Sequence, residues 1–396
     1  MTTSVRITKN IYGGDGLGRL GDGRVVFVPG AWAGETVKAE IFEEHRHHVR
    51  ARLVEVETAS PDRIVSPVPK LPGMVYADLA YSAELKAKEA QLLEFFNRAR
   101  LPFGDFRSPE PGRALNYRNK AVYHFARERG DWVLGYREEP SHRIVDVTVD
   151  PLAREEINAK LPEIRRHLRQ LLTTGPQGVR KSIAAQGDLT VRWTNKTGVK
   201  WWIGAPAEEL ILKETTAGLD FEVPADGFYQ VNPEVGEKLV AAVGREVRAA
   251  AGATPPSVVD LYCGVGVFGL SLKPVKLLGI ESGRRAIAFA KRNAAAQGMT
   301  NARFFAEEVG RNLRRIPIRG DSTVIIDPPR DGLEKGVAQW LARSKAPLIV
   351  YVSCDPATLM RDLKILAAGY RVRRVEWFDM FPRTARFETL TVLEKL

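Results

Sequence analysis

The stretch from Ser257 to Leu270, S-V-V-D-L-Y-C-G-V-G-V-F-G-L, constrains the fold of this chain more than any other. A short β-branched run ends in an acid, closely spaced glycines follow, and a second apolar run begins. Gly264 and Gly266 permit backbone angles, and a close approach of a ligand, that a Cβ atom would forbid. The pattern predicts a buried strand that turns sharply into a helix, although such turns also occur in α/β proteins without a ligand.

Three further strands follow at the spacing of a doubly wound parallel sheet. The run L-L-G-I-E predicts a buried strand that ends at Glu281, whose carboxylate can accept hydrogen bonds from both hydroxyls of a ribose. The runs 323–326 and 348–352 predict two more strands, followed by D-P-P-R and S-C-D-P. Since open α/β sheets bind ligands at the carboxyl ends of their strands, we expect a Rossmann-like domain with its site at that edge.

The composition favours a polyanionic partner. The net charge is +11, from 59 basic and 48 acidic residues, although a basic enzyme without such a partner stays possible on charge alone. Cys263 and Cys354 are the only cysteines of the 396 residues, too few for a disulfide framework or a cysteine metal cage. No apolar run approaches the roughly 20 residues that span a bilayer. We therefore expect a soluble protein of the reducing cytoplasm, with no bound metal.

The N-terminal part is predicted to be a small β-barrel. Short strands bounded by glycine are expected at 5–11, 25–28, 35–42 and 50–57. The glycine-rich run 13–23 superficially suggests a nucleotide loop, but a strand follows it, which favours turns and a hairpin. The run H-R-H-H-V-R-A-R, residues 45–52, is expected to contact phosphate, with a solvated basic hairpin as the alternative.

Four motifs together resemble those of the S-adenosylmethionine-dependent RNA uracil-5-methyltransferases, over nearly the whole chain: D-L-Y-C-G-V-G-V-F, D-P-P-R-D-G-L, Y-V-S-C-D-P-A-T-L-M-R-D-L and F-P-R-T-A-R-F-E. The run F-V-P-G-A-W-A-G-E resembles the TRAM domain, an RNA-holding barrel of oligonucleotide-binding type. The resemblance implies a Rossmann-like class I methyltransferase domain at the C-terminus with S-adenosyl-L-methionine as cofactor. Many relatives carry four cysteines for an iron–sulfur cluster where this chain has residues 66–79, and without thiolates no cluster is expected here.

Three domains follow from these features. Residues 1–60 are the expected TRAM-like barrel, and residues 226–396 the expected methyltransferase domain. Between them, residues 61–225 hold a linker helix that starts with Ser82 as its N-cap and runs to about residue 100, then a central α+β RNA-binding domain. That domain is expected to contain an antiparallel sheet and an amphipathic helix over 152–172. Its Trp193, Trp201 and Trp202 either stack on splayed bases or, as is commoner for tryptophans in strands, fill the core.

The resemblance also implies a covalent mechanism. Carbon 5 of uracil is a poor nucleophile, so a thiolate must first add to carbon 6, and Cys354, just beyond a strand, is the credible nucleophile. Cys263 lies inside the glycine turn, where packing is the default role. Glu388 matches the base that the family uses to remove the hydrogen from carbon 5. Arg383 and Arg386 stand where relatives commonly have glutamine and histidine, and their charge is expected to lower the pKa of Glu388.

The remaining site residues are carried over from the family or read from their chemistry. Glu308 is expected near the adenine, with Glu307 as a rival, and Asp327 is expected to contact the cofactor or the base. The expected cofactor residues are Gln230, Tyr262, Gly264, Gly266, Glu281, Glu308 and Asp327, and the expected RNA contacts are Arg118, Lys120 and Arg330.

Other functions stay open on the sequence alone. Enzymes that methylate exocyclic amino groups use a similar Asp-Pro-Pro turn, and RNA cytosine-5 methyltransferases also use a thiolate. A third possibility is a non-catalytic RNA-binding or ribosome-assembly factor. We expect the uracil-5 reaction on ribosomal RNA rather than transfer RNA, by a monomer, while the modified nucleotide is not given by the sequence.

Overall fold

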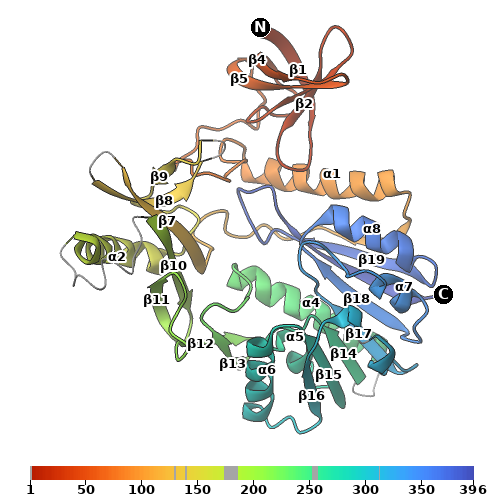
Figure 1. Cartoon of the computed structure of the whole chain (residues 1–396). Helices are drawn as coiled ribbons and strands as arrows, with labels where there is room; N and C mark the ends of the chain where they lie inside the picture. Colours follow the sequence, from red (N-terminus) through yellow and green to blue (C-terminus); the bar gives the residue numbers. More distant parts are fainter. Residues whose placement is uncertain (1, 129–130, 139–140, 174–185, 252–256, 312) are drawn as a thin grey trace. The chain divides into compact units, whose positions relative to one another are not determined.

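A computed structural model describes residues 2–128, 131–138, 141–173, 186–251, 257–311 and 313–396. The chain forms two compact units, coloured along the sequence in Figure 1. Unit 1 comprises residues 1–95 and 381–387, and unit 2 comprises residues 96–380 and 388–396. The domain boundaries expected at residues 60 and 225 stay predictions.

The first part of unit 1 is a closed barrel with the strand order β1-β2-β3-β5-β4, as predicted (Figure 1). Its strands are β1 (Thr2–Asn10), β2 (Gly16–Arg19), β3 (Val25–Val28), β4 (Thr36–Glu44) and β5 (His48–Thr58). Alternate side chains point inward, and small β-branched residues such as Val26, Val37 and Val49 fill the core. The glycine-rich run supplies β2, which pairs with β3, so it forms a hairpin and not a nucleotide loop.

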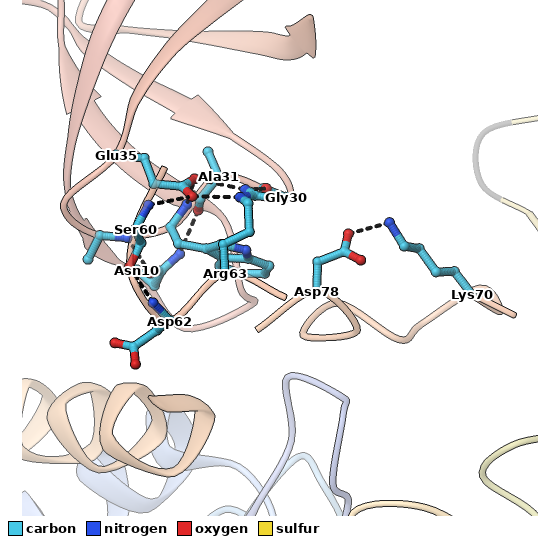
Figure 2. A network of polar contacts seen from close by, with 11 residues as sticks. Asn10, Gly30, Ala31, Glu35, Ser60, Asp62, Arg63, Lys70 and Asp78 are labelled. Atoms are coloured by element: carbon cyan, nitrogen blue, oxygen red, sulfur yellow. Dashed lines mark hydrogen bonds and ion pairs between the residues drawn. The ribbon is translucent and has the colours of Figure 1, made fainter. Parts of the chain in front are cut away.

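Glu35 fixes the chain where it leaves the barrel (Figure 2). Its fully buried carboxylate accepts hydrogen bonds from Arg63 Nε at 2.6 Å and from the backbone N–H groups of Trp32 at 2.8 Å and Ser60 at 3.2 Å. Arg63 also donates to the carbonyl of Gly30 at 2.7 Å. Because a buried charge is tolerated only when it is paired and hydrogen-bonded, these contacts hold the segment after the barrel in one conformation.

The predicted linker helix is α1 (Tyr81–Ala99), which begins in unit 1. Ser82 is the second residue of this helix, so it is not the N-cap that the sequence suggested. Two buried residues of α1, Glu84 and Lys88, form an ion pair at 2.8 Å. The spacing of four residues places them on one face of the helix, where the pair is shielded from water.

Residues 381–387 return to unit 1 from the far end of the chain. The backbone N–H of Arg383 donates to Glu84 at 2.7 Å, and its guanidinium donates to the carbonyl of Leu79 at 2.6 Å. The guanidinium of Arg386 donates to the hydroxyl of Tyr12 at 3.0 Å. Both arginines are therefore engaged within unit 1.

The central part of unit 2 has the predicted α+β character, with an antiparallel sheet in the order β11-β10-β7-β8-β9 (Figure 1). Its elements are β7 (Lys120–Glu128), β8 (Asp131–Arg137), β9 (Ile144–Asp146), α2 (Glu155–Thr173), β10 (Gln186–Thr194) and β11 (Gly198–Ile203). Helix α2 packs on β10 and β11 with the buried face that its periodicity predicted. A hairpin of β12 (Ile211–Thr216) and β13 (Leu219–Pro224) then leads toward the C-terminal part.

The tryptophans of the central sheet are engaged with other side chains of the protein. Trp202 is buried, and the guanidinium of Arg154 lies 3.9 Å from the ring centroid of Trp193. Trp201 contacts the ring of His167 edge-on at 5.3 Å. These contacts favour the packing interpretation of the three tryptophans over stacking on bases.

The C-terminal part of unit 2 is the predicted Rossmann-like domain, with the sheet order β16-β15-β14-β17-β18-β20-β19-β6 (Figure 1). Strands β14 to β18 are mutually parallel, and β20 runs antiparallel between β18 and β19. The strands are β14 (Ser257–Leu261), β15 (Lys276–Glu281), β16 (Ala302–Ala306), β17 (Ser322–Ile326), β18 (Leu348–Ser353), β19 (Tyr370–Phe378), β20 (Glu388–Lys395) and β6 (Phe103–Arg107). The edge strand β6 precedes the central sheet in the chain, and the sequence did not predict it.

Helices and short turns connect these strands. The helices are α4 (Pro233–Ala251), α5 (Val267–Ser271), α6 (Arg284–Ala296), α7 (Val337–Ala342) and α8 (Pro356–Leu366), with 3-10 turns η1 (Val309–Arg311) and η2 (Leu313–Arg315). Asn232 caps helix α4 by accepting a hydrogen bond from the N–H of Val235 at 3.3 Å. Among the described helices, none is both long enough and apolar enough to cross a membrane.

Candidate active site

A cavity lies at the carboxyl ends of β14 and β17, the edge where the sequence placed the site. Its wall combines the glycine turn after β14, the loop before α4 and the start of the D-P-P-R run. The lining residues are Thr216, Phe228, Tyr229, Gln230, Pro233, Gly236, Val240, Tyr262, Cys263, Gly264, Val265, Val267, Phe268 and Asp327. Four of the expected cofactor residues are therefore brought together: Gln230, Tyr262, Gly264 and Asp327.

The two glycines of the turn have different roles. Both have positive φ, 54° at Gly264 and 88° at Gly266, which L-residues rarely adopt. A Cβ atom at Gly264 would meet no protein atom within 4 Å, so this glycine leaves open space at the cavity wall. A Cβ atom at Gly266 would lie 2.9 Å from Leu270, so this glycine permits the turn to pack on α5. Only Gly264 is thus shaped for contact with a ligand.

Glu281 ends β15 as predicted, and its carboxylate is partly satisfied by its own turn. Oε1 accepts hydrogen bonds from the backbone N–H of Gly283 at 2.7 Å and from the hydroxyl of Ser282 at 3.0 Å. These bonds orient the carboxylate. Oε2 of Glu281 accepts no hydrogen bond from the described part of the chain. Glu281 is therefore ready to accept a further donor, although it does not line the cavity itself.

The expected adenine neighbour, Glu308, lies on the surface beyond β16. Its carboxylate pairs with Arg311 at 2.5 Å and is about half exposed. The rival Glu307 is less exposed, and its backbone N–H donates to the carbonyl of Glu281 at 2.9 Å. The cavity lining includes neither glutamate.

Two aspartates at the ends of β14 and β17 share an acidic environment. Burial, with smaller contributions from Asp260 and Glu281, raises the pKa of Asp327 to about 7. Burial and Glu281 likewise raise the pKa of Asp260 to about 7, although Asp260 accepts a hydrogen bond from the N–H of Gly269 at 3.0 Å. Sequence reasoning did not select Asp260 for the site. Its position as the acid that ends the first strand, like Glu281 on the second, was the available signal.

Cys354 and Glu388 are brought together by strand register. Strands β18 and β20 are antiparallel, with Ser353 facing Thr389, and the hydroxyl of Thr389 donates to the carbonyl of Ser353 at 3.0 Å. One residue further along, the same register sets Cys354 opposite Glu388. Residues separated by 34 positions in the sequence thus meet at the carboxyl edge of the sheet, next to Asp327.

The electrostatics of this pair favour the neutral forms. Burial, followed by the carboxyl groups of Glu388 and Asp327, raises the pKa of the Cys354 thiol to about 12. Burial and Asp327 raise the pKa of Glu388 well above its usual value. Arg330 acts in the opposite direction on both groups. Oε2 of Glu388 is buried and has no hydrogen-bond partner among the described residues, so the group has unused bonding capacity.

The expectation that Arg383 and Arg386 lower the pKa of Glu388 is wrong. The pKa moves upward, because burial dominates, and the cation that opposes this shift is Arg330. The guanidiniums of Arg383 and Arg386 instead bond to the carbonyl of Leu79 and the hydroxyl of Tyr12.

The expected RNA contacts of the central domain lie at the start of β7. Lys120 is half-buried and is paired across the sheet with Arg192. Burial, and next the charge of Arg192, lowers the pKa of Lys120, so an anion at this position would relieve the repulsion. Arg118 is also half-buried, and its Nε donates to the hydroxyl of Tyr117 at 3.2 Å. Cys263, by contrast, is buried with a pKa well above its usual value, which fits a packing role.

Comparison with known proteins identifies the family. The profile of the tRNA (uracil-5-)-methyltransferase family matches residues 208–396, and the TRAM domain profile matches residues 2–54. An uncharacterized RNA methyltransferase of Gloeobacter violaceus is 34% identical over all of this chain and 96% of its own length. The 23S rRNA (uracil(1939)-C(5))-methyltransferase RlmD of Shewanella amazonensis is 31% identical over 94% of this chain and 91% of its own length. The chain belongs to the RNA uracil-5-methyltransferase family.

A solved structure agrees with this RNA methyltransferase in fold over its whole length. The tRNA (uracil-54, C5)-methyltransferase of Pyrococcus abyssi, crystallised with S-adenosyl-L-homocysteine, superposes with a TM-score of 0.74 at 22% identity. The match covers 98% of the present chain and 100% of the other. The predicted family, the fold with its TRAM barrel, the enzyme class and S-adenosylmethionine as methyl donor are thus confirmed.

Proposed function

We propose that this enzyme transfers a methyl group from S-adenosylmethionine to carbon 5 of a uridine in RNA through a covalent adduct of Cys354 with the base. The observation that carries the proposal is the register of β18 and β20, whose last pair, Ser353 and Thr389, makes Cys354 and Glu388 neighbours at the edge of the sheet. A nucleophile and a base on one side of a small site are what addition and elimination on one ring require.

Each residue of the pair serves one step. The Cys354 thiolate adds to carbon 6 of the uracil, and the electron pair of the carbon 5–carbon 6 double bond moves toward oxygen 4 as an enolate. S-Adenosylmethionine supplies the methyl group that carbon 5 then takes. The Glu388 carboxylate accepts the proton from carbon 5, the double bond forms again and the Cys354 thiolate leaves. Its raised pKa makes Glu388 a stronger base than an exposed glutamate once it is ionised.

Two features at this edge of the sheet support cofactor binding. The open space at Gly264 admits a ligand close to the backbone, and Oε2 of Glu281 is left to accept a ribose hydroxyl. We assign Gln230, Tyr262 and Asp327 to the wall around the bound cofactor and the reacting base. Gly266 supports this site through the turn. The role proposed for Glu308 has the weakest support, since the residue pairs with Arg311 at the surface.

The RNA is proposed to contact the barrel, the start of β7 and the D-P-P-R run. Arg118 and Lys120 supply positive charge, and Arg330, which acts electrostatically on both Cys354 and Glu388, is proposed to engage the uracil or its phosphate. Ribosomal RNA is the proposed substrate, because the RlmD relative, 31% identical to this chain, acts on 23S rRNA. The enzyme is still expected to be a monomer and to hold no iron–sulfur cluster. Iron and sulfide analysis of the purified protein tests the second expectation.

Mass spectrometry of nucleosides tests the proposal. In vitro transcripts of 23S rRNA and of transfer RNA are incubated with the enzyme and S-adenosylmethionine, then digested to nucleosides. We expect 5-methyluridine from the ribosomal transcript and none with Cys354→Ala. Detection of 5-methylcytidine would establish the cytosine-5 alternative, and methylation of the transfer RNA alone would reverse the assignment of the substrate.

A further inference from the structure

The loop of residues 225–232, here called the cofactor loop, runs from β13 to α4 and carries Tyr229 and Gln230 into the wall of the cavity. The central sheet holds this loop by its backbone carbonyls. Arg192 of β10 donates to the carbonyl of Gly227 at 3.0 Å and to that of Ala225 at 3.3 Å. Because these hydrogen bonds are made to the main chain, they restrict the backbone conformation of the loop independently of its side chains.

Asn119 holds the end of the cofactor loop that includes Gln230. Its backbone N–H donates to the carbonyl of Val231 at 2.8 Å, and its side-chain Nδ2 donates to the carbonyl of Gln230 at 3.1 Å. Its own carbonyl accepts from the N–H of Trp193 at 2.8 Å, which fixes it to the central sheet. Asn119 is only 1% exposed, so its amide has no ready exchange with water.

The position of Asn119 in the sequence gives these bonds a functional meaning. It stands between Arg118 and Lys120, the two residues proposed to contact RNA, and it touches the backbone of Gln230, proposed to contact the cofactor. We propose that Asn119 is a positioning residue that couples RNA binding to cofactor binding, an inference that rests on the function proposed above. If RNA binding shifts the start of β7, Asn119 moves with it. The backbone of Gln230, which is hydrogen-bonded to Asn119, then moves as well.

Coupling of this kind must be reciprocal. If RNA changes the affinity for the cofactor by some factor, the cofactor changes the affinity for RNA by the same factor. The coupling passes through two hydrogen bonds, and a single neutral bond is worth a factor of about three to ten in an equilibrium constant. Loss of the Nδ2 bond is therefore expected to reduce both cofactor affinity and coupling by a factor of that size.

The first experiment measures S-adenosylhomocysteine affinity by calorimetry in the intact enzyme without RNA. Asn119→Leu keeps nearly the same side-chain volume and the backbone N–H bond but cannot donate to the carbonyl of Gln230, so affinity should fall about threefold to tenfold. Asn301→Leu is the matched control, because Asn301 likewise donates to two carbonyls, those of Pro274 at 2.7 Å and Val275 at 2.8 Å, beside the starts of β15 and β16. The control should bind as the unmodified enzyme does.

A double variant separates positioning from a general effect on the fold. If Asn119 acts through Gln230, Asn119→Leu should cause no further loss of affinity in a Gln230→Ala background. Equal losses in both backgrounds would overturn the inference. If Gln230→Ala alone leaves affinity unchanged, the cofactor placement in the proposed function fails instead, so the two failures are distinguishable.

The second experiment tests the coupling itself. Affinity for S-adenosylhomocysteine is measured with and without a 30-nucleotide oligouridine. The ratio of the two affinities is then compared between the unmodified enzyme and Asn119→Leu. We expect a ratio that differs from one in the unmodified enzyme and moves toward one in the variant. Hydrogen exchange should meanwhile become faster in residues 225–232 of the variant and stay unchanged in the barrel. A ratio of one in the unmodified enzyme, or unchanged exchange in the loop, would refute the coupling.

Discussion

At the scale of single residues, the chemistry depends on the protonation state of the Cys354 thiol. Burial of the Cys354 thiol and the charges of three nearby carboxyl groups outweigh the opposing guanidinium of Arg330, so the pKa of the thiol is raised to about 12. At neutral pH the free enzyme therefore holds a small fraction of thiolate.

The pH dependence of alkylation tests this assignment, because Cys263 is buried and the iodoacetamide rate reports Cys354. A raised pKa means that thiolate forms only as pH increases, so the rate constant should rise about tenfold per pH unit from about pH 7 to about pH 10. Arg330→Gln removes the cation that lowers the pKa, and the rate should fall about twofold to fourfold throughout. Arg343→Gln is the control and should leave the rate constant unchanged. A rate constant that reaches a plateau below about pH 9 would contradict the prediction.

Glu388→Gln should separate the two halves of the reaction. The variant keeps the nucleophile but loses the base, so addition and methylation proceed while elimination stalls. A methylated protein–RNA adduct should accumulate as a slow band on denaturing gels with labelled S-adenosylmethionine. Cys354→Ser should give no adduct, since the thiolate is missing. Normal turnover by Glu388→Gln without an adduct would transfer the search for the base to Asp327 or to water.

At the scale of elements, segments are held by buried polar contacts as well as by apolar packing. Glu35 connects the barrel to the residues that follow it, and Asn119 connects β7 to the cofactor loop. Both are fully or nearly buried, with their bonds directed at backbone groups or at one partner charge. Losing a hydrogen bond costs the most free energy when it leaves a buried group without a partner. Substitutions at such residues should therefore have large effects.

The Glu35–Arg63 pair makes a prediction about stability. Arg63→Ala leaves a buried carboxylate without its cation and should lower the free energy of unfolding by about 3 to 5 kcal/mol. Lys70→Ala, which removes an exposed partner of Asp78 (Figure 2), should change it by about 0 to 1 kcal/mol. Urea unfolding of the intact chain, followed by tryptophan fluorescence, measures both. Equal effects of the two substitutions would refute the argument.

The same pair sets a pH dependence with a definite sign. Burial alone would raise the pKa of Glu35, but Arg63 and the N–H groups of Trp32 and Ser60 more than offset it, so the pKa is lowered. A carboxylate of this kind stabilises the fold above its unfolded pKa, and the contribution is lost as pH falls through the folded value. The urea concentration at the unfolding midpoint should therefore decrease as the pH is lowered from about 5 to about 3. In Glu35→Gln this decrease in the midpoint should be smaller.

At the scale of the whole molecule, RNA affinity should depend on charge in the barrel hairpin of residues 45–52. Deleting residues 1–60 is a poor test, because it also removes Tyr12, which receives a hydrogen bond from Arg386. Arg46→Gln with Arg52→Gln changes only exposed cations. If both contact phosphates, the slope of log affinity against log salt for a 30-nucleotide oligouridine should become less negative by about 1.4, because each phosphate contact on a single strand contributes about 0.7. Arg343→Gln with Lys345→Gln is the matched control and should leave it unchanged.

The sequence alone determined the parts of this protein that depend on local pattern. Period-two strands and glycine turns predicted the barrel and the parallel sheet, because backbone preferences act over a few residues. The acids that end strands, and the cysteine after β18, could be placed at one edge for the same reason. Motifs in the same stretches named the family, the reaction class and the methyl donor.

Tertiary structure alone decided what depends on residues distant in the chain. The strand β6 joins the edge of a sheet whose other strands lie more than 140 positions later, which no local pattern encodes. Arg383 and Arg386 are near Glu388 in sequence but bond within unit 1, so their effect on its pKa was predicted wrongly. Burial fixes that pKa, and burial is a property of the assembled fold, because many segments must come together to exclude water from one group.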